Sequence, residues 1–264
     1  MLIAALQMEP VPADTGANLA KIERAARSAA AMGVTLLVAP ELAVSGYSLG
    51  ARFATIAEPA EGPSIARIRA MAAEQGMAIC VGFPERADGV VYNSAVLATP
   101  SGDLHIYRKC HLYGPKERAA FAVSTAPPAV FELGGLKVGM LICYDVEFPE
   151  MVRGLALQGA QLVLVPTALP AGPSARQVSR LIVPSRAMEN QLFIAYADLC
   201  GVENGAAYEG RSVIAAPDGE YLARAGRDET LLFARINPAA YAVTEAETPY
   251  LADRMPEVYR KLLP

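Results

Sequence analysis

The sequence predicts an α/β domain, and two observations support this prediction. Short apolar runs typical of buried strands alternate with longer segments in which apolar residues recur at helical spacing. The chain has 264 residues, of which 53% are hydrophobic and 19% charged, so one large core can form. No repeat, low-complexity segment or change in composition divides it. We therefore expect a single domain over residues 1–264, with about 245–264 as a C-terminal tail.

The first half of the chain begins with strands and helices in alternation. A helix is expected to end at Gly33, since glycine commonly terminates helices. The segment 99–102 (Thr-Pro-Ser-Gly) is typical of a turn, so the strands on either side of it are expected to be antiparallel. The elements expected here are a strand at 2–8, a helix at 14–32, a strand at 35–39, a helix at 64–75, and strands at 77–83, 91–98 and 103–109.

The second half continues the same pattern after a long loop expected at 113–128. Long loops in compact domains are often functional. Gly134 and Gly135 predict a hairpin between two strands. The elements expected here are strands at 129–133 and 136–142, a helix at 149–158, a strand at 162–165, a helix at 175–191, and strands at 192–197, 212–216, 220–225 and 230–236.

Composition and charge exclude several classes of function. The net charge is −4 and no basic run occurs, which argues against a nucleic-acid partner. No apolar stretch reaches the roughly 18 residues of a membrane span, and the N-terminus lacks the features of a signal peptide. The four cysteines are widely spaced and there are only two histidines, so no metal site or metal cofactor is expected. We expect a cytoplasmic protein with free thiols and no membrane partner.

Cys143 lies at a corner between a buried strand and a helix start. An apolar run over 138–142 precedes it, and Asp145 and Pro149 are residue types that begin helices. A helix N-terminus favours the thiolate form of a nearby cysteine, so this residue is a candidate nucleophile. The alternative is an unreactive structural cysteine, which most buried cysteines are.

Two further strand ends carry a charged residue. Glu41 follows the apolar strand 35–39, and Lys109 follows the strand at 103–109. A single charge at such a place is ordinarily a solvated loop residue. Three such corners bearing Glu, Lys and Cys, in this order, resemble the nitrilase superfamily of carbon–nitrogen hydrolases. The resemblance covers nearly the whole chain and includes three further segments, Asn93–Ser94, Arg186–Asn190 and Gly210–Gly219.

The resemblance implies both a fold and an assembly. The superfamily fold is a four-layer αββα sandwich with two mixed sheets face to face. Its members usually pair through their helical layers, often with help from the C-terminal tail, so a homodimer or higher homo-oligomer is expected. The segments that most resemble bacterial aliphatic amidases within the superfamily are 107–114, 141–150 and 249–254.

The same residues suggest a division of chemical roles, which the resemblance also implies. A cysteine nucleophile needs a base, and Glu41 is the candidate. Lys109 and the backbone N–H of Tyr144 can stabilise an oxyanion. A protease-like pair of Cys143 with His111 is the less favoured alternative, because a third, orienting group is missing from its motif.

Glu117 is a candidate positioning residue. It begins a Glu-x-x-x-Phe element, at which the superfamily places a second glutamate; the alternative is a surface charge paired with Arg118. The sequence departs from the superfamily over 121–124, which reads Phe-Ala-Val-Ser where Phe-x-Pro-Gly is common. The candidates for lining the substrate pocket, for which simple packing is an equal alternative, are Tyr47, Tyr113, Thr167 and Ala168.

The expected function is that of a cofactor-free amidase. It would hydrolyse a small aliphatic amide, including one with a terminal amine, to a carboxylic acid and ammonia through a thioester on Cys143. A nitrilase or an N-carbamoyl amine hydrolase would use the same three residues, so both stay open. A binding protein without catalytic activity is the third possibility, against which the intact Glu41, Lys109 and Cys143 argue.

Overall fold

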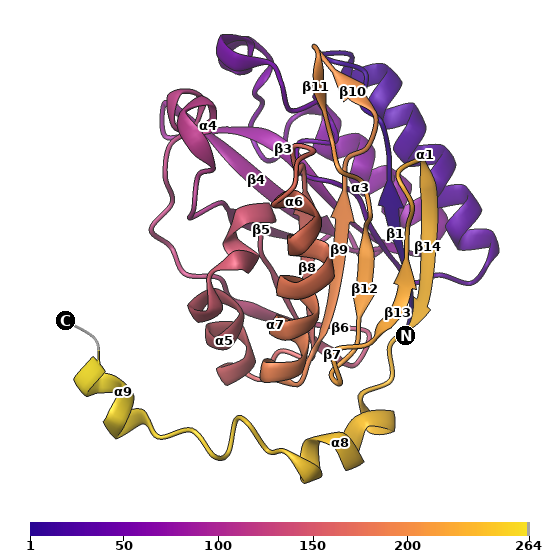
Figure 1. Ribbon diagram of the computed structural model, residues 1–264. Coiled ribbons are helices and arrows are strands. Elements are labelled where there is room, and N and C mark those ends of the chain that lie inside the picture. Colours follow the sequence, from indigo (N-terminus) through magenta and orange to yellow (C-terminus); the bar gives the residue numbers. More distant parts are fainter. Residues whose placement is uncertain (263–264) are drawn as a thin grey trace.

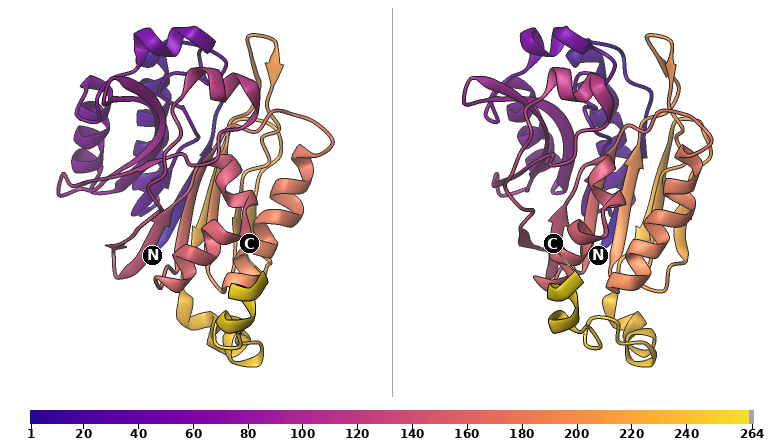
Figure 2. Two further views of the ribbon diagram at one scale, coloured as in Figure 1. Left: turned by 90° about the vertical axis from the view of Figure 1, so that its left-hand side faces the viewer. Right: turned by 60° about the vertical axis from the view of Figure 1, so that its left-hand side comes forward.

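The computed structural model describes residues 1–262 and shows two six-stranded mixed sheets packed face to face. Helices cover the outer face of each sheet, which gives the four-layer αββα sandwich that the resemblance implied (Figure 1, Figure 2). Sequence periodicity predicted the α/β class, but it does not show how strands divide between two sheets.

The first sheet contains most of the N-terminal strands. Its strands, in spatial order, are β14 (Thr230–Arg235), β1 (Leu2–Gln7), β2 (Leu36–Val38), β3 (Ala78–Ala87), β4 (Val90–Ala98) and β5 (Leu104–Arg108). Its outer face is covered by α1 (Thr15–Ala31) and α3 (Pro63–Gln75). The Asp14 side chain caps α1 by accepting the Ala17 N–H at 2.9 Å, and Gly76 ends α3 with a φ of 61°.

The second sheet is built from the C-terminal half. Its strands, in spatial order, are β13 (Tyr221–Arg224), β12 (Val213–Ala215), β9 (Phe193–Asp198), β8 (Leu162–Thr167), β7 (Leu136–Met140) and β6 (Val130–Leu133). Helices α5 (Pro149–Leu157), α6 (Ala175–Gln177) and α7 (Val183–Asn190) lie on its outer side (Figure 1).

The single helix predicted over 175–191 is interrupted. A π-helical segment, Val178–Ile182, separates α6 from α7. Pro184 has no N–H to donate to the preceding turn, which explains an irregular hydrogen-bond pattern there. The hydroxyl of Tyr221 donates to the carbonyls of Ser179 and Arg180 at 3.2 and 2.9 Å, so these oxygens have partners.

The core between the sheets contains the inner-face side chains of the central strands. Pairs β1–β2 and β2–β3 are parallel in the first sheet, and β7–β8 and β8–β9 are parallel in the second. Parallel strands buried on both faces have nearly continuous apolar sequences, as these do. The turn after β2 meets the end of β8 in the other sheet, where the Glu41 N–H donates to the Thr167 carbonyl at 3.4 Å.

Short elements complete the chain. The loop expected over 113–128 contains a helix, α4, which begins with the pair Gly114–Pro115, and proline suits the first turn of a helix. The tail runs along one end of the sandwich, and residues 263–264 of it lie outside the described residues (Figure 1). None of the helices within residues 1–262 is both long and apolar enough to cross a membrane. The short elements are α2 (Phe53–Ile56), α4 (Gly114–Ala120), β10 (Val202–Glu203), β11 (Ala206–Ala207), α8 (Ala242–Glu247), α9 (Pro256–Leu262) and 3₁₀ helices at Gly50–Arg52, Cys143–Glu147 and Pro238–Tyr241.

Candidate active site

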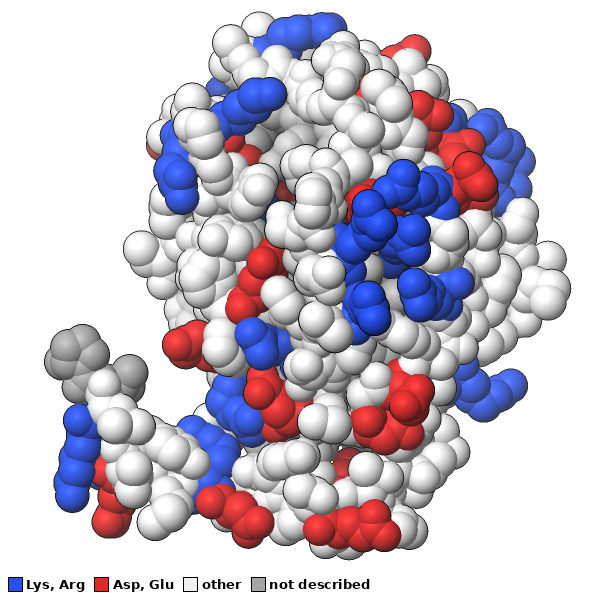
Figure 3. Space-filling view, in the orientation of Figure 1, with Lys and Arg blue, Asp and Glu red and all other residues white. Residues whose placement is uncertain are grey.

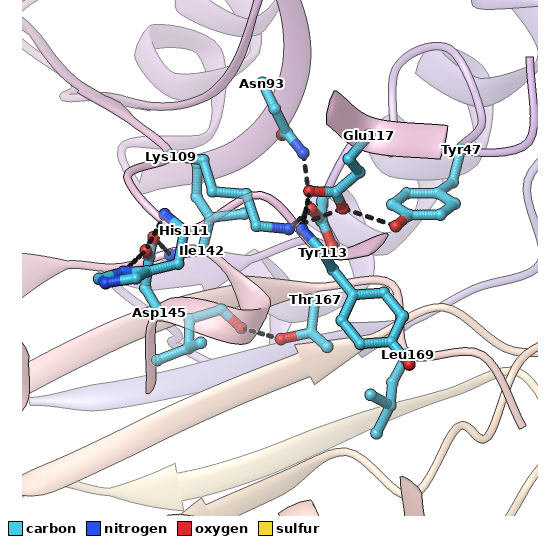
Figure 4. A network of polar contacts seen from close by, with 12 residues as sticks. Tyr47, Asn93, Lys109, His111, Tyr113, Glu117, Ile142, Asp145, Thr167 and Leu169 are labelled. Atoms are coloured by element: carbon cyan, nitrogen blue, oxygen red, sulfur yellow. Dashed lines mark hydrogen bonds and ion pairs between the residues drawn. The ribbon is translucent and has the colours of Figure 1, made fainter. Parts of the chain in front are cut away.

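Lys109 lies at the centre of the site, directly after β5. Its side chain is fully buried, and its Nζ donates to Glu41 Oε1 at 2.7 Å and to Glu117 Oε1 at 2.8 Å (Figure 4). Burial alone would lower the pKa of Lys109, but the negative charges of Glu41 and Glu117 outweigh it and raise the pKa above its ordinary value. The ammonium group therefore keeps its charge inside the protein.

Glu41 is the buried carboxylate on one side of this ammonium. It lies in the turn after β2, and its Oε1 also accepts the Asn93 side-chain amide at 2.7 Å. Its Oε2 is buried and has no hydrogen-bond partner among the described residues. Burial raises the pKa of Glu41 to about 7, with Lys109 opposing this shift and Glu117 adding to it. A carboxylate with such a pKa suits proton transfer near neutral pH.

The backbone around Glu41 is packed closely against β3. The N–H of Gly82 donates to the Pro40 carbonyl at 3.0 Å. A Cβ atom added at Gly82 would lie 2.5 Å from Glu41 Cα and 2.3 Å from the Leu42 backbone nitrogen, which is closer than real Cβ atoms come. Glu41 can therefore lie where it does only because residue 82 is a glycine.

Cys143 begins a short 3₁₀ helix after β7 and is buried. Its φ is 47°, in the left-handed region that costs a residue with a Cβ about 1–2 kcal/mol. Asp145 holds this turn by accepting the Ile142 N–H at 3.2 Å. Tyr144 is the second residue of the 3₁₀ helix, and the first N–H groups of a helix lack acceptors within it. The corner predicted from the sequence is thus present, with a strained backbone at the cysteine.

Arg186 on α7 supports the other end of this 3₁₀ helix. Its guanidinium donates to the carbonyls of Val146 and Glu147 at 3.2 and 2.9 Å. It also pairs with Glu189 at 3.0 Å. The segment Arg186–Asn190 therefore contributes to the site as a scaffold for the cysteine turn.

The pKa of Cys143 is determined by burial more than by its place at a helix start. Burial and the Glu41 charge raise the pKa of the thiol, whereas Lys109 and the backbone N–H of Ala168 lower it, and the net pKa is well above the ordinary value. The loss of water around the sulfur therefore outweighs the helix terminus, which by itself favours the thiolate. Cys143 is therefore a neutral thiol at rest, and a base must take its proton when it acts as a nucleophile.

Glu117 is buried on α4 and is not an exposed surface charge. Its Oε1 accepts both the Lys109 ammonium and the Tyr47 hydroxyl, the latter at 2.5 Å, and its Oε2 accepts the Tyr113 N–H at 2.8 Å (Figure 4). Three donors, from Tyr47, Lys109 and Tyr113, thus meet at one carboxylate. This geometry is what a positioning role for Glu117 requires.

The four candidate lining residues differ in what they contact. Tyr47 binds Glu117, and Ala168 directs its N–H at the sulfur of Cys143. Tyr113 is half-exposed, with its ring edge against Tyr144 at 5.3 Å. The Thr167 hydroxyl donates to the Val165 carbonyl of its own strand at 3.1 Å, so it is engaged by the backbone.

His111 belongs to a second polar network. Its Nδ1 lies 2.8 Å from Asp145 Oδ1, which also accepts the His111 backbone N–H at 2.9 Å. Its ring stacks on Phe148 with centroids 3.8 Å apart. An orienting carboxylate therefore exists, contrary to the sequence argument, but Figure 4 shows this network apart from the one around Lys109.

Sequence reasoning assigned no role to Asn93. The Asn93 carbonyl accepts the Lys109 N–H at 2.9 Å, so the two residues are neighbours on adjacent chain segments. The predicted antiparallel pairing of 91–98 with 103–109 was the signal that could have placed them together. Within residues 1–262, no group of His, Cys, Asp and Glu side chains is arranged to hold a metal ion.

Comparison with known proteins identifies the family of the chain. The sequence signature of the carbon-nitrogen hydrolase family matches residues 2–245. A protein of Pseudomonas protegens described as a hydrolase in the pqqF 5′ region is 42% identical over 99% of this chain and 92% of its own length. An (R)-stereoselective amidase of a Pseudomonas species is 36% identical over 96% of this chain and 91% of its own.

A solved structure extends the similarity to three dimensions. A mutant amidase from Nesterenkonia sp. AN1, which carries acrylamide added to its active-site cysteine, superposes with a TM-score of 0.90. It is 37% identical, and the match covers 100% of both chains. The present chain therefore belongs to the carbon–nitrogen hydrolases of the nitrilase superfamily, enzymes that hydrolyse carbon–nitrogen bonds other than peptide bonds.

Proposed function

We propose that this enzyme hydrolyses a small aliphatic amide to a carboxylic acid and ammonia through a thioester on Cys143. One observation carries the proposal: the buried Glu41 carboxylate has a pKa of about 7, one of its oxygens has no partner among residues 1–262, and Lys109 binds the other oxygen. A base in this state can accept a proton from a thiol and return it to a leaving amine.

The first half of the reaction forms the thioester. Glu41 accepts the thiol proton as the sulfur of Cys143 attacks the amide carbonyl carbon. The oxyanion that develops is stabilised by the Lys109 ammonium and the N–H of Tyr144. Glu41 then gives the proton to the amide nitrogen, the carbon–nitrogen bond breaks and ammonia leaves. Glu117 contributes by keeping the ammonium in place.

The second half returns the enzyme to its starting state. Glu41 takes a proton from a water molecule, whose oxygen attacks the thioester carbonyl with the same two groups stabilising the oxyanion. When the carbon–sulfur bond breaks, the sulfur takes the proton back from Glu41 and the carboxylic acid is released. The raised pKa of Cys143 favours this last step, because the departing sulfur readily regains a proton.

The substrate class is proposed on sequence similarity. The segments 107–114, 141–150 and 249–254 most resemble aliphatic amidases, and within them 5-aminopentanamidase, which acts on an amide with a terminal amine. Amidases are also among the relatives. On the same resemblance we propose a homodimer or higher homo-oligomer, and on the four free cysteines we propose a cytoplasmic location.

A matched set of three compounds tests the proposal. An amide, a nitrile and an N-carbamoyl amine with the same carbon chain are incubated with the enzyme, and ammonia and the organic product are measured. We expect the amide to react fastest, and intact mass after acid quenching to show an acyl group on wild-type protein but not on Cys143→Ala. Faster conversion of the nitrile or carbamoyl compound would replace the proposal by that activity, and no conversion of any of them would favour a binding protein.

A further inference from the structure

The hairpin formed by β10 and β11 lies outside the catalytic residues but contacts the loop that carries Tyr47. Glu203 on this hairpin is fully buried. Its Oε2 accepts the backbone N–H groups of Tyr47 and Ser48 at 2.8 and 3.0 Å, and the hydroxyl of Tyr208 at 2.9 Å. One carboxylate oxygen thus fixes the backbone at Tyr47.

The loop is shaped to lie against this carboxylate. Gly46 has a φ of 85°, and a Cβ added to it would lie 2.4 Å from Glu203 Oε1. The rings of Tyr47 and Tyr208 meet edge to face with centroids 6.0 Å apart. The position of Tyr47 is therefore determined at its backbone by Glu203 and at its ring by Tyr208.

The side chain of Tyr47 contacts the charged cluster of Glu117, Lys109 and Glu41. Its hydroxyl donates to Glu117 Oε1 at 2.5 Å, and the same oxygen accepts the Lys109 ammonium at 2.8 Å. Lys109 in turn donates to Glu41 at 2.7 Å. Glu203 is thus joined to Glu41 by hydrogen bonds of 2.5–2.8 Å and by the side chain of Tyr47. The other residues of this series are buried.

We infer that Glu203 is a positioning residue of the active site, acting through Tyr47 and Glu117 on the Lys109 ammonium. Glu203 touches no reacting group, so its effect should be on the rate of the chemical steps more than on substrate affinity. The inference rests on the proposed function, since Lys109 is taken to stabilise the oxyanion. A loop anchor with only a structural role would lower stability without changing kcat per folded molecule.

A double-mutant cycle separates the two roles. Glu203→Ala and Tyr47→Phe should each lower kcat about tenfold, the scale of one lost hydrogen bond in a chain that aligns a charge. If Glu203 acts through the Tyr47 hydroxyl, adding Glu203→Ala to Tyr47→Phe should lower kcat little further. Effects that multiply, or a wild-type kcat in Glu203→Ala, would overturn the inference. If Glu203→Ala does not fold, Glu203→Asp, whose carboxylate is one methylene too short to reach the loop, takes its place in the cycle.

Two further variants complete the test. In Glu203→Gln the amide oxygen can still accept the same three donors, so kcat should recover to near wild type; a loss equal to that of Glu203→Ala would contradict the inference. Asn204→Ala is the matched control on the same hairpin, because its exposed side chain donates to the Ser48 carbonyl at 2.8 Å without reaching Tyr47, and its kcat should stay at the wild-type value. If the wild-type protein hydrolyses the amide and forms the Cys143 thioester, the proposed function stands. A cycle that fails under these conditions would then reject only the role of Glu203.

Discussion

Two clusters in this protein place several charges of one sign around a single buried charge of the other sign. In the first, the carboxylates of Glu41 and Glu117 flank the Lys109 ammonium. In the second, the guanidinium groups of three arginines surround the Glu209 carboxylate, with the shortest contact at 2.9 Å; they are Arg176, Arg211 and Arg227. Basic side chains gather on the surface beside α6 in Figure 3.

The clusters differ in how much water they contact and in whether every oxygen is bonded. Arg176 and Arg227 keep more than half of their side-chain surface in solvent, and both oxygens of Glu209 accept hydrogen bonds. All three side chains of the Lys109 cluster are buried, and Glu41 Oε2 has no partner in the described part of the chain. A charge cluster whose oxygens are all hydrogen-bonded and whose partners contact solvent stabilises a fold. A buried cluster with one unbonded carboxylate oxygen is suited to proton transfer.

Removal of the nucleophile should have the largest effect. Cys143→Ala should lower kcat on the order of 10⁶-fold, as loss of a nucleophile does in other covalent enzymes. Alanine tolerates the backbone conformation about as well as cysteine, so the melting temperature should change little. Cys110→Ala is the control and should keep activity within about twofold. Residual activity of a few per cent in Cys143→Ala would show that another group attacks the substrate.

Glu41→Gln should lower kcat by about 10²–10⁴-fold, the usual contribution of a general base. Glutamine keeps the shape and can accept the Lys109 hydrogen bond, but it cannot take the thiol proton. Substrate affinity, measured separately by a binding assay, should be retained. Turnover at the wild-type rate would transfer the role of base to another residue, with His111 the first to examine.

Lys109→Arg tests the geometry of the ammonium and not its charge. The planar guanidinium is larger and does not place its N–H groups where the compact ammonium lies. Loss of one oxyanion donor lowers the rate about 10²–10³-fold. Single-turnover kinetics should show slower acyl-enzyme formation and slower hydrolysis of the thioester. A wild-type rate for both steps would remove Lys109 from oxyanion stabilisation.

The pH dependence of kcat/KM should follow the ionisation of Glu41, whose pKa is raised. Glu41 must be ionised to accept a proton, and its pKa is about 7, so kcat/KM should rise with pH through a midpoint near 7. The negative charge of Glu117 contributes to raising this pKa, so Glu117→Gln should move the midpoint to lower pH, although its maximum rate is reduced. A midpoint at the ordinary glutamate value of about 4.3 in the wild type would contradict the assignment.

The smallest effect on activity should come from the arginine-rich cluster. Glu209→Gln weakens the contacts of Arg211 and Arg227, so the free energy of unfolding should fall by about 1–2 kcal/mol in a denaturant titration. Activity should stay within about twofold, since the arginines remain solvated. A large loss of kcat without loss of stability would mean that the two clusters are coupled.

The sequence predicted the strand ends that carry Glu41, Lys109 and Cys143, because apolar runs bounded by polar residues can be recognised locally. The burial that raises the pKa of the Cys143 thiol could not be predicted, since distant segments produce it. The links from Tyr47 to Glu117 and from Asn93 to Glu41 were also missed. They join residues 70 and 52 positions apart in the chain, and such pairs depend on the packing of whole layers.

The close approach of Gly82 to the Glu41 backbone has a consequence for mutational tolerance. A Cβ there would overlap backbone atoms, which cannot rotate away as a side chain would. One added methyl group on β3 would therefore shift the turn that carries the base, without altering any charged or polar group of the site. A survey of variants that weighs only side-chain chemistry would score Gly82→Ala as conservative. In this fold we expect Gly82→Ala to inactivate the enzyme.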